Sequence, residues 1–509
     1  MKNVPGLLAG LIAFVVLATA NGAGYRYGVS DQAAYVPAVV RAENPAAFPR
    51  DATVIDTQGQ FFVLDDVLAA IGRATGASTE ALFFGAYLVS LALVWAGVVL
   101  IGTRLYPSSL GSLGMTPNQV EGSPWLTVAL AAVITLRHSI PRTSANSLEP
   151  YFHPRLMAFG IGMIAIAAFL RRRDRLVIAL VGLSAVCHVT TALWFAILIG
   201  TALAVADPRR RRLAGAGAGV ALVVLAWAIT AGPLHAASAT MDAVWIEALA
   251  ERDFIFANEW PLWVWAANLG LLAVLWWAHA ARARRGTATP EDRGLVWGAT
   301  ALVAIFLLTL PAVAAHVAVA VQFQLSRVFW VVDLLVAVYG LAALGESMPG
   351  RGVKVLAIVL LASTVARGTY IIQRERAERS LFQLSLPDTP WTDAMRWIAR
   401  QPIGTHVLAD PGHSWKYGSS VRVAAGRDVL LEDVKDSAIA MYNRDLAVRV
   451  VERRRALGDF AALTAEGARA LAARYDLNYL VTESTLDLPE VYRNAQFRIY
   501  ALKPAGPAS

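Results

Sequence analysis

Long apolar stretches recur along most of this chain, and short clusters of arginine separate them. Runs that could cross a bilayer as helices lie near 6–22, 82–103, 124–139, 155–170, 176–188, 190–206, 213–232, 262–281, 295–315, 328–346 and 353–371. A bilayer core needs about 20 apolar helical residues. Of the 509 residues, 57% are hydrophobic and 16% are charged. The sequence therefore predicts a mainly α, polytopic transmembrane bundle of about 11 spans.

The arginine clusters predict the orientation of these spans. They occupy 171–175, 209–212, 282–285 and 351–354, each between two apolar runs. Such clusters remain on the cytoplasmic side, and with the amino terminus inside every one of them falls there. Because topology accounts for the net charge of +8, nucleic acid is not an expected partner. The outer face then receives the loop 23–81, the loop 140–154 and the chain after residue 371.

Two places in this assignment stay open. The first segment also resembles a signal peptide, since LLAGLIAFVVLATANGAG ends in small residues; we interpret it as an anchor. The stretch 176–206 is long for one helix and short for two. We predict a break at His188, which a single helix would bury at mid-membrane.

The sequence changes character after residue 371. Alternating apolar residues in THVLAD, SVRVAA, RDVLLE, NYLVTE and FRIYAL predict strands. Helical spacing of apolar residues in WTDAMRWIAR, DLAVRVVERRRAL and AEGARALAARY predicts amphipathic helices. We therefore predict a transmembrane domain over 1–371, which includes the outer loop 23–81, and a small extracytoplasmic α/β domain over 372–509.

Two aspartates in the first outer loop are candidate catalytic residues. Asp31 closely follows the first span, and Asp51 lies further along the same loop. A carboxylate near the membrane that faces a cavity or a partner could have a functional role. Alternatively, Ser30 or Asp31 simply caps a helix that begins at Gln32.

The stretch LRHSIPRTSANSLEPYFHPR, residues 136–155, predicts an anion site. A proline suits the first turn of a helix, so Arg155 would lie beside the positive helix end, where anions bind. Arg137, Arg142 and Arg155 would then bind a phosphate, with Glu149 and His153 completing a polar wall. The alternative is a loop clamp in which Arg155 pairs with Glu149 while Arg137 extends towards the interface.

Two further outer segments carry substrate-binding candidates. His188, in CHVTTALWF, either contacts a substrate or is a structural residue bonded to Thr190 or Thr191. In AVQFQLSRVFWVVD, Gln324 and Arg327 directly precede a span. Arg327 is either an interfacial anchor or a further phosphate ligand.

Other motifs point to structure rather than chemistry. The loop DPGHSWKYG, 410–418, is typical of a turn after a strand, although His413 and Lys416 could touch a substrate. GAGAG at 215–219 lies in an apolar run and favours close helix packing over dinucleotide binding. The eight histidines are scattered, so we predict no dedicated metal site and leave a divalent metal ion open as a cofactor.

The layout as a whole resembles the C-type glycosyltransferase (GT-C) superfamily. The shared features are an amino-terminal span, a large first outer loop with an early aspartate, outward-facing arginines and an extracytoplasmic carboxy-terminal domain. The stretches LEPYFHPRLMAFG, CHVTTALWF and YRNAQFRIYAL are similar to segments of uncharacterised bacterial membrane proteins in this superfamily.

This resemblance implies a function. Members transfer a sugar, with inversion, from a polyprenyl-phosphate donor to a glycan, lipid or protein acceptor outside the bacterial inner membrane. An acidic residue of the first outer loop is their general base; Asp31 matches that place and Asp51 matches it less well. Family members often carry paired acidic residues there, whereas Gln32 follows here. A transporter of lipid-linked substrates and a non-catalytic scaffold remain alternatives, although no internal repeat typical of transporters is visible.

Overall fold

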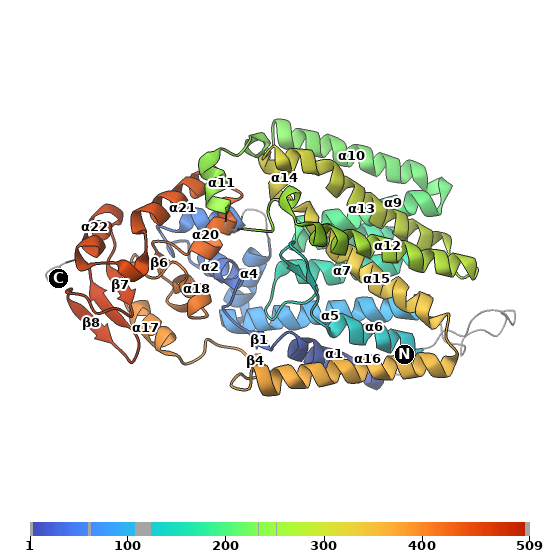
Figure 1. Ribbon diagram of the computed structural model, residues 1–509, viewed down its shortest axis with the longest axis horizontal. Helices are drawn as coiled ribbons and strands as arrows, with labels where there is room; N and C mark the ends of the chain where they lie inside the picture. Colours follow the sequence, from blue (N-terminus) through green and yellow to red (C-terminus); the bar gives the residue numbers. More distant parts are fainter. Residues whose placement is uncertain (1–3, 60–62, 107–123, 233, 251, 504–509) are drawn as a thin grey trace. The chain divides into compact units, whose positions relative to one another are not determined.

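The computed structural model describes residues 4–59, 63–106, 124–232, 234–250 and 252–503 (Figure 1). The chain forms two compact units. Unit 1 consists of Met1–Tyr25, Ala86–Thr240 and Asp253–Phe382, and unit 2 of Arg26–Gly85, Met241–Arg252 and Gln383–Ser509. This grouping differs from the predicted division into 1–371 and 372–509, because most of the first outer loop and one later loop belong to the same unit as the carboxy-terminal segment.

Unit 1 is a bundle of helices. Its helices are α1 (Val4–Asn21), the larger part of α5 (Thr79–Leu105), α6 (Pro124–Thr135), α7 (Pro154–Leu170), α8 (Asp174–Cys187), α9 (Val189–Ala206), α10 (Arg211–Thr230), α12 (Leu262–Arg284), α13 (Pro290–Ala314), α14 (Ala318–Gln322), α15 (Val328–Gly345) and α16 (Gly350–Tyr370). Within the described residues, eight helices are long and apolar enough to cross a membrane. The protein is therefore a mainly α, polytopic membrane protein.

Every predicted span corresponds to a helix, but three of these helices are short. α6 has 12 residues, α7 has 17 and α8 has 14. At about 1.5 Å per residue, even the longest of the three spans only about 25 Å. Eight helices thus meet the length and hydropathy of a span, against the predicted number of about 11. The predicted break at His188 is present, since its extended backbone separates α8 from α9.

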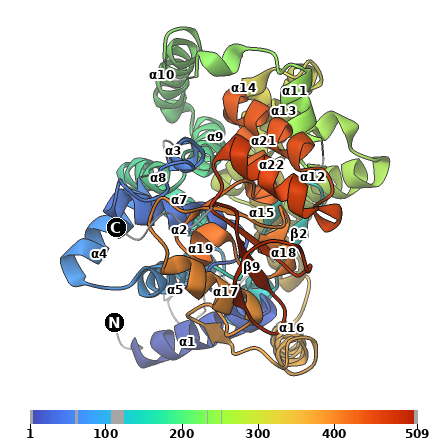
Figure 2. The same cartoon turned by 90° about the vertical axis from the view of Figure 1, so that its left-hand side faces the viewer.

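Apolar side chains on several helices of unit 1 face outwards. Val223 on α10 is 70% exposed, Leu262 on α12 is 82% exposed and Leu308 on α13 is 79% exposed. Figure 2 shows α10 at the edge of the bundle. Large exposed apolar surfaces are rare on soluble proteins, so this surface is suited to contact with lipid.

Arginines of the clusters at 171–175 and 282–285 pair with the ends of neighbouring helices in unit 1. Arg104 at the end of α5 donates to the Leu170 carbonyl at the end of α7, over 3.0 Å. Arg172 pairs with Glu291 at the start of α13, at 2.6 Å. Arg282 near the end of α12 pairs with Asp292 of α13 and Glu346 after α15. These links join the ends of neighbouring helices within unit 1.

Unit 2 combines helices with a five-stranded sheet. Its helices are α2 (Gln32–Glu43), α3 (Ala52–Gly59), α4 (Leu64–Thr75), α11 (Ala243–Leu249), α17 (Pro390–Ala399), α18 (His413–Lys416), α19 (Val421–Ala424), α20 (Asp433–Ala440), α21 (Arg444–Leu457) and α22 (Ala465–Tyr475). The sheet contains β5 (His406–Leu408), β6 (Asp428–Val429), β7 (Tyr479–Thr482), β8 (Glu490–Arg493) and β9 (Arg498–Ala501), in the order β6-β5-β7-β9-β8. β5 is parallel to β6 and β7, whereas β9 is antiparallel to β7 and β8.

Helix α17 shows how the sequence builds the core of unit 2. Thr389 caps its first turn, and Pro390 occupies the first helical position, where a missing N–H has no cost. Trp391, Met395 and Ile398 recur at helical spacing and are buried in the same core cluster as strand residues of the sheet. Burying each such side chain contributes about 1.5–3 kcal/mol to folding.

Four of the five predicted strands of the carboxy-terminal segment are present, and one prediction is wrong. SVRVAA forms the short helix α19, because the Ser420 hydroxyl accepts a hydrogen bond from Val423 N at 3.1 Å and caps a helical turn. The alternation of Val421, Arg422 and Val423 is what suggested a strand. Arg422 is 2% exposed, since it pairs with buried carboxylates. β8 and α20 were not predicted.

Candidate functional site

A polar hairpin precedes α7 in unit 1. Strands β2 (Ser139–Ile140) and β3 (Ala145–Asn146) pair antiparallel. Between them Arg142 and Ser144 adopt φ angles of 52° and 53°, the left-handed region that closes a tight turn. The Thr143 hydroxyl donates to the Ile140 carbonyl over 2.9 Å. The hairpin thus replaces the last part of the predicted span 124–139.

Helix α7 begins as the sequence predicts, with Pro154 at its first position and His153 as its cap. His153 Nδ1 accepts a hydrogen bond from Arg155 N at 3.2 Å. The Arg155 guanidinium pairs with the carboxylate of Glu149, and each of these residues is 3% exposed. Asn146 also donates to Glu149 Oε1, over 3.3 Å. The clamp that the sequence left open as an alternative is therefore formed.

Helix α9 begins beside α7. His188 caps α9, and its Nδ1 lies 3.3 Å from Thr191 N and 2.9 Å from the Thr191 hydroxyl. The His188 ring lies 6.3 Å from the His153 ring, measured between centroids. Burial, together with the charges of Arg155 and Arg327, lowers the pKa of His188 to about 3. The imidazole is therefore neutral near pH 7, as a cap that accepts hydrogen bonds requires.

Arg327 brings a second guanidinium to the same region. Its Nε donates to the Thr143 carbonyl in the hairpin turn, over 3.2 Å. Gln324, with a φ of 45° and 9% exposure, turns the chain just before α15. We call Glu149, His153, Arg155, His188 and Arg327 the α7–α9 cluster. Since α7 starts here and ends beside the arginine cluster at 171–175, the two lie at opposite ends of that helix.

The other predicted phosphate ligands, Arg137 and Arg142, are exposed residues of unit 1. Arg142 pairs with Asp253 at 2.9 Å, and both side chains are more than one-third exposed. Arg137 is exposed directly after α6. Because an exposed guanidinium is well solvated, neither residue has the buried setting that makes Arg155 distinctive.

A half-buried polar pair that the sequence did not predict includes Asp333, in the first half of α15. His138 Nδ1 is 3.1 Å from Asp333 Oδ2. Asp333 interrupts the apolar run VFWVVDLLVAVYG, and an ionisable residue inside a span is a signal of function or of a required partner. Nearby on the helix bundle, Arg367 of α16 donates to Asn21 at the end of α1, over 3.1 Å.

This pair predicts a pH dependence of stability. The hydrogen bond that the protonated His138 ring donates to Asp333 raises the pKa of His138, so the folded protein binds this proton more tightly than the unfolded chain does. The contribution of the pair is fully present below the unfolded pKa of about 6.5 and is lost as the pH rises through the raised value. We expect Asp333→Asn to lower the melting temperature at about pH 6 and to matter much less at about pH 9. A melting difference that does not change with pH would contradict this expectation. In a His138→Gln background, which lacks the titrating imidazole, Asp333→Asn should change the melting temperature equally at both pH values.

In unit 2, Asp31 stands at the start of α2, which begins at Gln32 as predicted. Its side chain forms no capping hydrogen bond. Asp31 Oδ1 instead pairs with Lys435 Nζ at 2.6 Å, and the Asp31 side chain is 34% exposed. The predicted cap is thus an ion pair, and the carboxylate keeps partial access to its surroundings.

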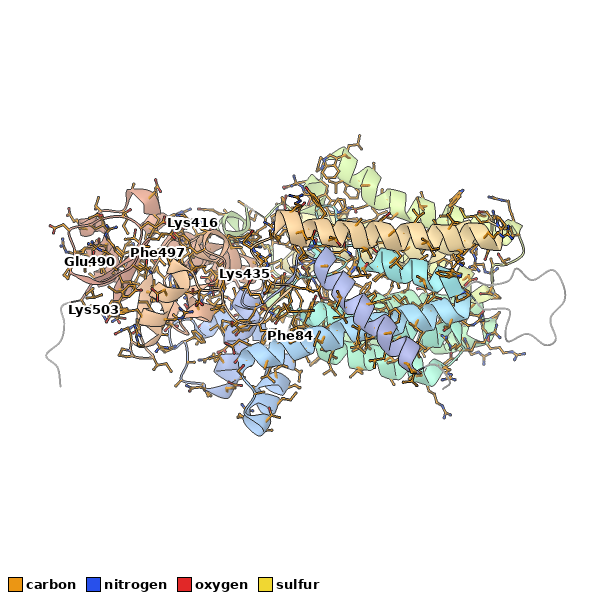
Figure 3. All side chains as sticks on the ribbon, turned by 90° about the horizontal axis from the view of Figure 1, so that it is seen from below. Phe84, Lys416, Lys435, Glu490, Phe497 and Lys503 are labelled. Atoms are coloured by element: carbon orange, nitrogen blue, oxygen red, sulfur yellow. The ribbon has the colours of Figure 1, made fainter. Side chains whose placement is uncertain are left out.

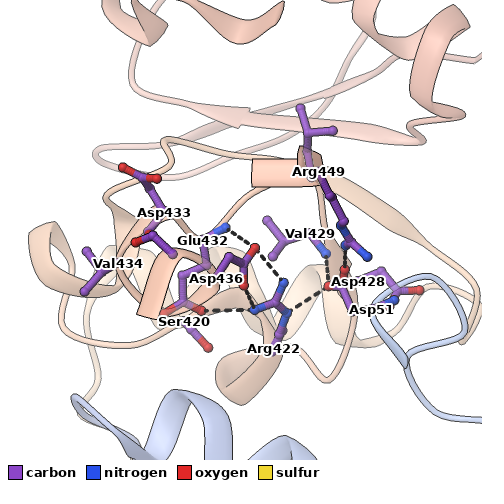
Figure 4. A network of polar contacts seen from close by, with 12 residues as sticks. Asp51, Ser420, Arg422, Asp428, Val429, Glu432, Asp433, Val434, Asp436 and Arg449 are labelled. Carbon is purple, nitrogen blue, oxygen red and sulfur yellow. Dashed lines mark hydrogen bonds and ion pairs between the residues drawn. The ribbon is translucent and has the colours of Figure 1, made fainter. Parts of the chain in front are cut away.

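Asp51 lies in a buried ion network of unit 2 (Figure 4). It has no exposed surface, and it pairs with Arg422 at 2.8 Å and with Arg449. It also accepts a hydrogen bond from Val429 N at 3.0 Å. Burial alone would raise the pKa of Asp51, but the two arginines and the hydrogen bonds hold it well below its usual value. A carboxylate so enclosed and so acidic is a poor proton acceptor, which removes Asp51 as a catalytic candidate.

Three more carboxyl groups belong to this network. Asp436 pairs with Arg422 at 2.6 Å, and Asp428 accepts a hydrogen bond from Asp51 N at 3.0 Å. Burial raises the pKa of Asp428 to about 6 and that of Glu432 to about 7. The network therefore joins the first outer loop to β6 and α20, and its role in unit 2 is structural.

Within the part of the chain that the structure describes, no group of three or more His, Cys, Asp and Glu side chains could hold a metal ion. A search of protein families and of curated proteins found no family model and no curated relative that matches this chain.

Proposed function

We propose that this protein is a GT-C-like glycosyltransferase of the bacterial inner membrane, which moves a sugar with inversion from a polyprenyl-phosphate donor to an extracytoplasmic acceptor. The observation that carries the proposal is the α7–α9 cluster. There helices α7 and α9 begin side by side, and the charges of two arginines act on one buried histidine.

The electrostatics of this cluster favour an anionic headgroup. The first turn of a helix carries about half a positive charge, and α7 and α9 bring two such ends together. Arg155 and Arg327 add two full charges, of which Glu149 offsets one. In a donor of this class the phosphate is the leaving group, so fixed positive charge stabilises the transition state as negative charge develops. The lipid tail would extend along the apolar outer surface of the helices.

The base is assigned through the resemblance to the superfamily. Asp31 stands in the first outer loop, where the resemblance places the general base, and its side chain retains exposed surface. A carboxylate in this role takes the proton of the acceptor hydroxyl as the sugar is transferred.

The proposal includes the predicted topology. α10 and α16 begin at arginine clusters, which would be cytoplasmic, and segments of unit 2 follow both helices in the chain. A third segment of unit 2 follows α1. All three segments would then be extracytoplasmic, on the side where lipid-linked donors and their acceptors meet.

A binding and transfer assay tests this function. The purified full-length protein in lipid nanodiscs would be mixed with polyprenyl-phosphate donors that carry a labelled sugar. We expect saturable donor binding. Polyprenyl phosphate should compete with the donor, and uncharged polyprenol should not. Addition of an acceptor should release polyprenyl phosphate. Equal competition by polyprenol would contradict a phosphate site. Movement of donor across proteoliposomes without phosphate release would favour the transporter alternative instead.

A further inference from the structure

The strand order of unit 2 reverses direction at β5. The chain runs from β5 to β6 on one side and then to β7 on the other side of β5, and all three strands are parallel. In open α/β sheets, ligands bind outside the carboxyl ends of the strands at such a reversal. Asp410 lies just after β5, and Glu483 follows β7 directly. The residues at this edge belong to neither the α7–α9 cluster nor the network around Asp51.

Polar side chains from these two strand ends are held together by one lysine. Lys416 Nζ lies 3.0 Å from Asp410 Oδ2 and 3.4 Å from Glu483 Oε2. Gln496 donates to Glu483 Oε1. Figure 3 labels Lys416. Its side chain is 50% exposed, and that of Glu483 is 39% exposed. These groups are therefore fixed in position by mutual contacts while they remain accessible to solvent.

An exposed tryptophan directly precedes Lys416 in the chain. Trp415 in α18 is 69% exposed. Residues at both ends of this short helix fix it to the core of unit 2. His413 is fully buried, and Tyr417 stacks on Trp391 at 4.8 Å between ring centroids. α18 thus presents a large aromatic surface from a rigid base. Such an exposed ring beside fixed polar groups is typical of a recognition site.

The charges of this edge select the class of ligand. Asp410 and Glu483 outnumber Lys416. The charge of Arg498, which donates to the Glu483 carbonyl, is offset by its pair with Glu490. The edge therefore disfavours phosphates and nucleotides. α18 has four residues and offers no helix dipole that could compensate. Neighbouring hydroxyl groups of a sugar, in contrast, can donate to carboxylates and accept from an ammonium or amide group. The face of an indole ring packs well against the C–H groups of a pyranose.

We propose that Asp410, Trp415, Lys416, Glu483 and Gln496 form a binding site for neutral saccharides. The site is separate from the proposed donor site, and it does not depend on transfer activity. It would hold a glycan chain on unit 2 through hydroxyl hydrogen bonds and ring stacking.

Saccharide binding by the purified full-length protein tests this site. Malto-, manno- and chito-oligosaccharides, immobilised through their reducing ends, would be the probes. We expect saturable binding of at least one series, and about tenfold weaker binding by Trp415→Ala, since tenfold in affinity corresponds to about 1.4 kcal/mol. Trp415→Phe keeps a ring for stacking and should retain most of the affinity. Trp263→Ala removes a tryptophan that is 59% exposed in α12 of unit 1 and should bind as the unaltered protein does.

Three outcomes would overturn the proposal: no binding of any series, equal binding by Trp415→Ala, or preferential binding of nucleotides or acidic peptides. Glu483→Gln gives a second, independent variant, since it keeps the size of the side chain and removes one acceptor charge. Because Trp415 and Glu483 are exposed, melting temperatures close to that of the unaltered protein are expected and separate lost binding from misfolding. Sugar transfer that persists without saccharide binding would refute this site alone.

Discussion

Asp31→Asn is expected to lower the rate of sugar transfer by a factor of about 10² to 10⁴ while donor affinity stays within about twofold of the unaltered protein. The amide has the size of the carboxylate but cannot take a proton from the acceptor. Donor affinity should persist, because it is assigned to the positive charges of the α7–α9 cluster. Single-turnover transfer and equilibrium donor binding, measured on the same preparation in nanodiscs, give the two quantities separately.

The ion pair between Asp31 and Lys435 supplies the decisive control. If Asp31 mattered only through this pair, Lys435→Gln would slow transfer as much as Asp31→Asn does. If Asp31 is the base, Lys435→Gln should slow transfer much less than Asp31→Asn does. Asp56→Asn removes a more exposed aspartate of the same loop, which pairs with Arg41, and should leave transfer unchanged. Full turnover by Asp31→Asn would refute the assigned base.

Arg422→Met is expected to destabilise unit 2 by about 3–5 kcal/mol. Arg422 is almost completely buried between Asp51 and Asp436, which have 0% and 2% exposure. Methionine approximates the length of the arginine stem but leaves these buried carboxylates without their main counter-charge. Uncompensated buried charge is among the most destabilising changes that a single substitution can make. Thermal unfolding of the full-length protein, followed together with protease cleavage of the segment after residue 383, would report the loss.

A matched ion pair on the surface distinguishes the effect of burial on stability from the effect of losing a charge. Arg455 pairs with Glu247, also within unit 2, but the two side chains are 65% and 42% exposed. Arg455→Met should therefore cost at most about 1 kcal/mol, because exposed pairs contribute little. Adding Asp51→Asn and Asp436→Asn to Arg422→Met should restore part of the lost stability, since the charges that were left without a partner are removed as well. Equal losses from Arg422→Met and Arg455→Met would contradict a buried role for the network.

Local sequence pattern accounts well for the helices of unit 1. Each predicted span corresponds to a helix, and the chain breaks at His188 as predicted, with Thr191 satisfying the imidazole. These features depend on residues within one or two turns of each other. Helix length was less predictable: the run 124–139 reads as one apolar segment, but its last residues form the hairpin before α7 because Ser147 and Thr143 supply local hydrogen bonds.

The candidate site was only partly predictable for the same physical reason. The sequence nominated His153, Arg155, His188 and Arg327, and the structure brings these together within unit 1. It also nominated Arg142, whose partner Asp253 lies far along the chain, and it overlooked Asp333, whose partner is His138. The sequence shows which residues are charged but not which residues they contact.

The sequence by itself determined that this chain is helical, apolar and built to lie in a membrane, because hydropathy and helical spacing are local properties. Only the tertiary structure decided which charged groups are buried. Asp51 and Arg422 are 371 residues apart in the chain and 2.8 Å apart in space. Because of this contact, the candidate base Asp51 is a buried partner of an ion pair. Arg422, predicted to lie in a strand, is a buried cation in the core of unit 2. Coulomb energy and desolvation depend on distance and burial, and neither can be obtained from the order of residues.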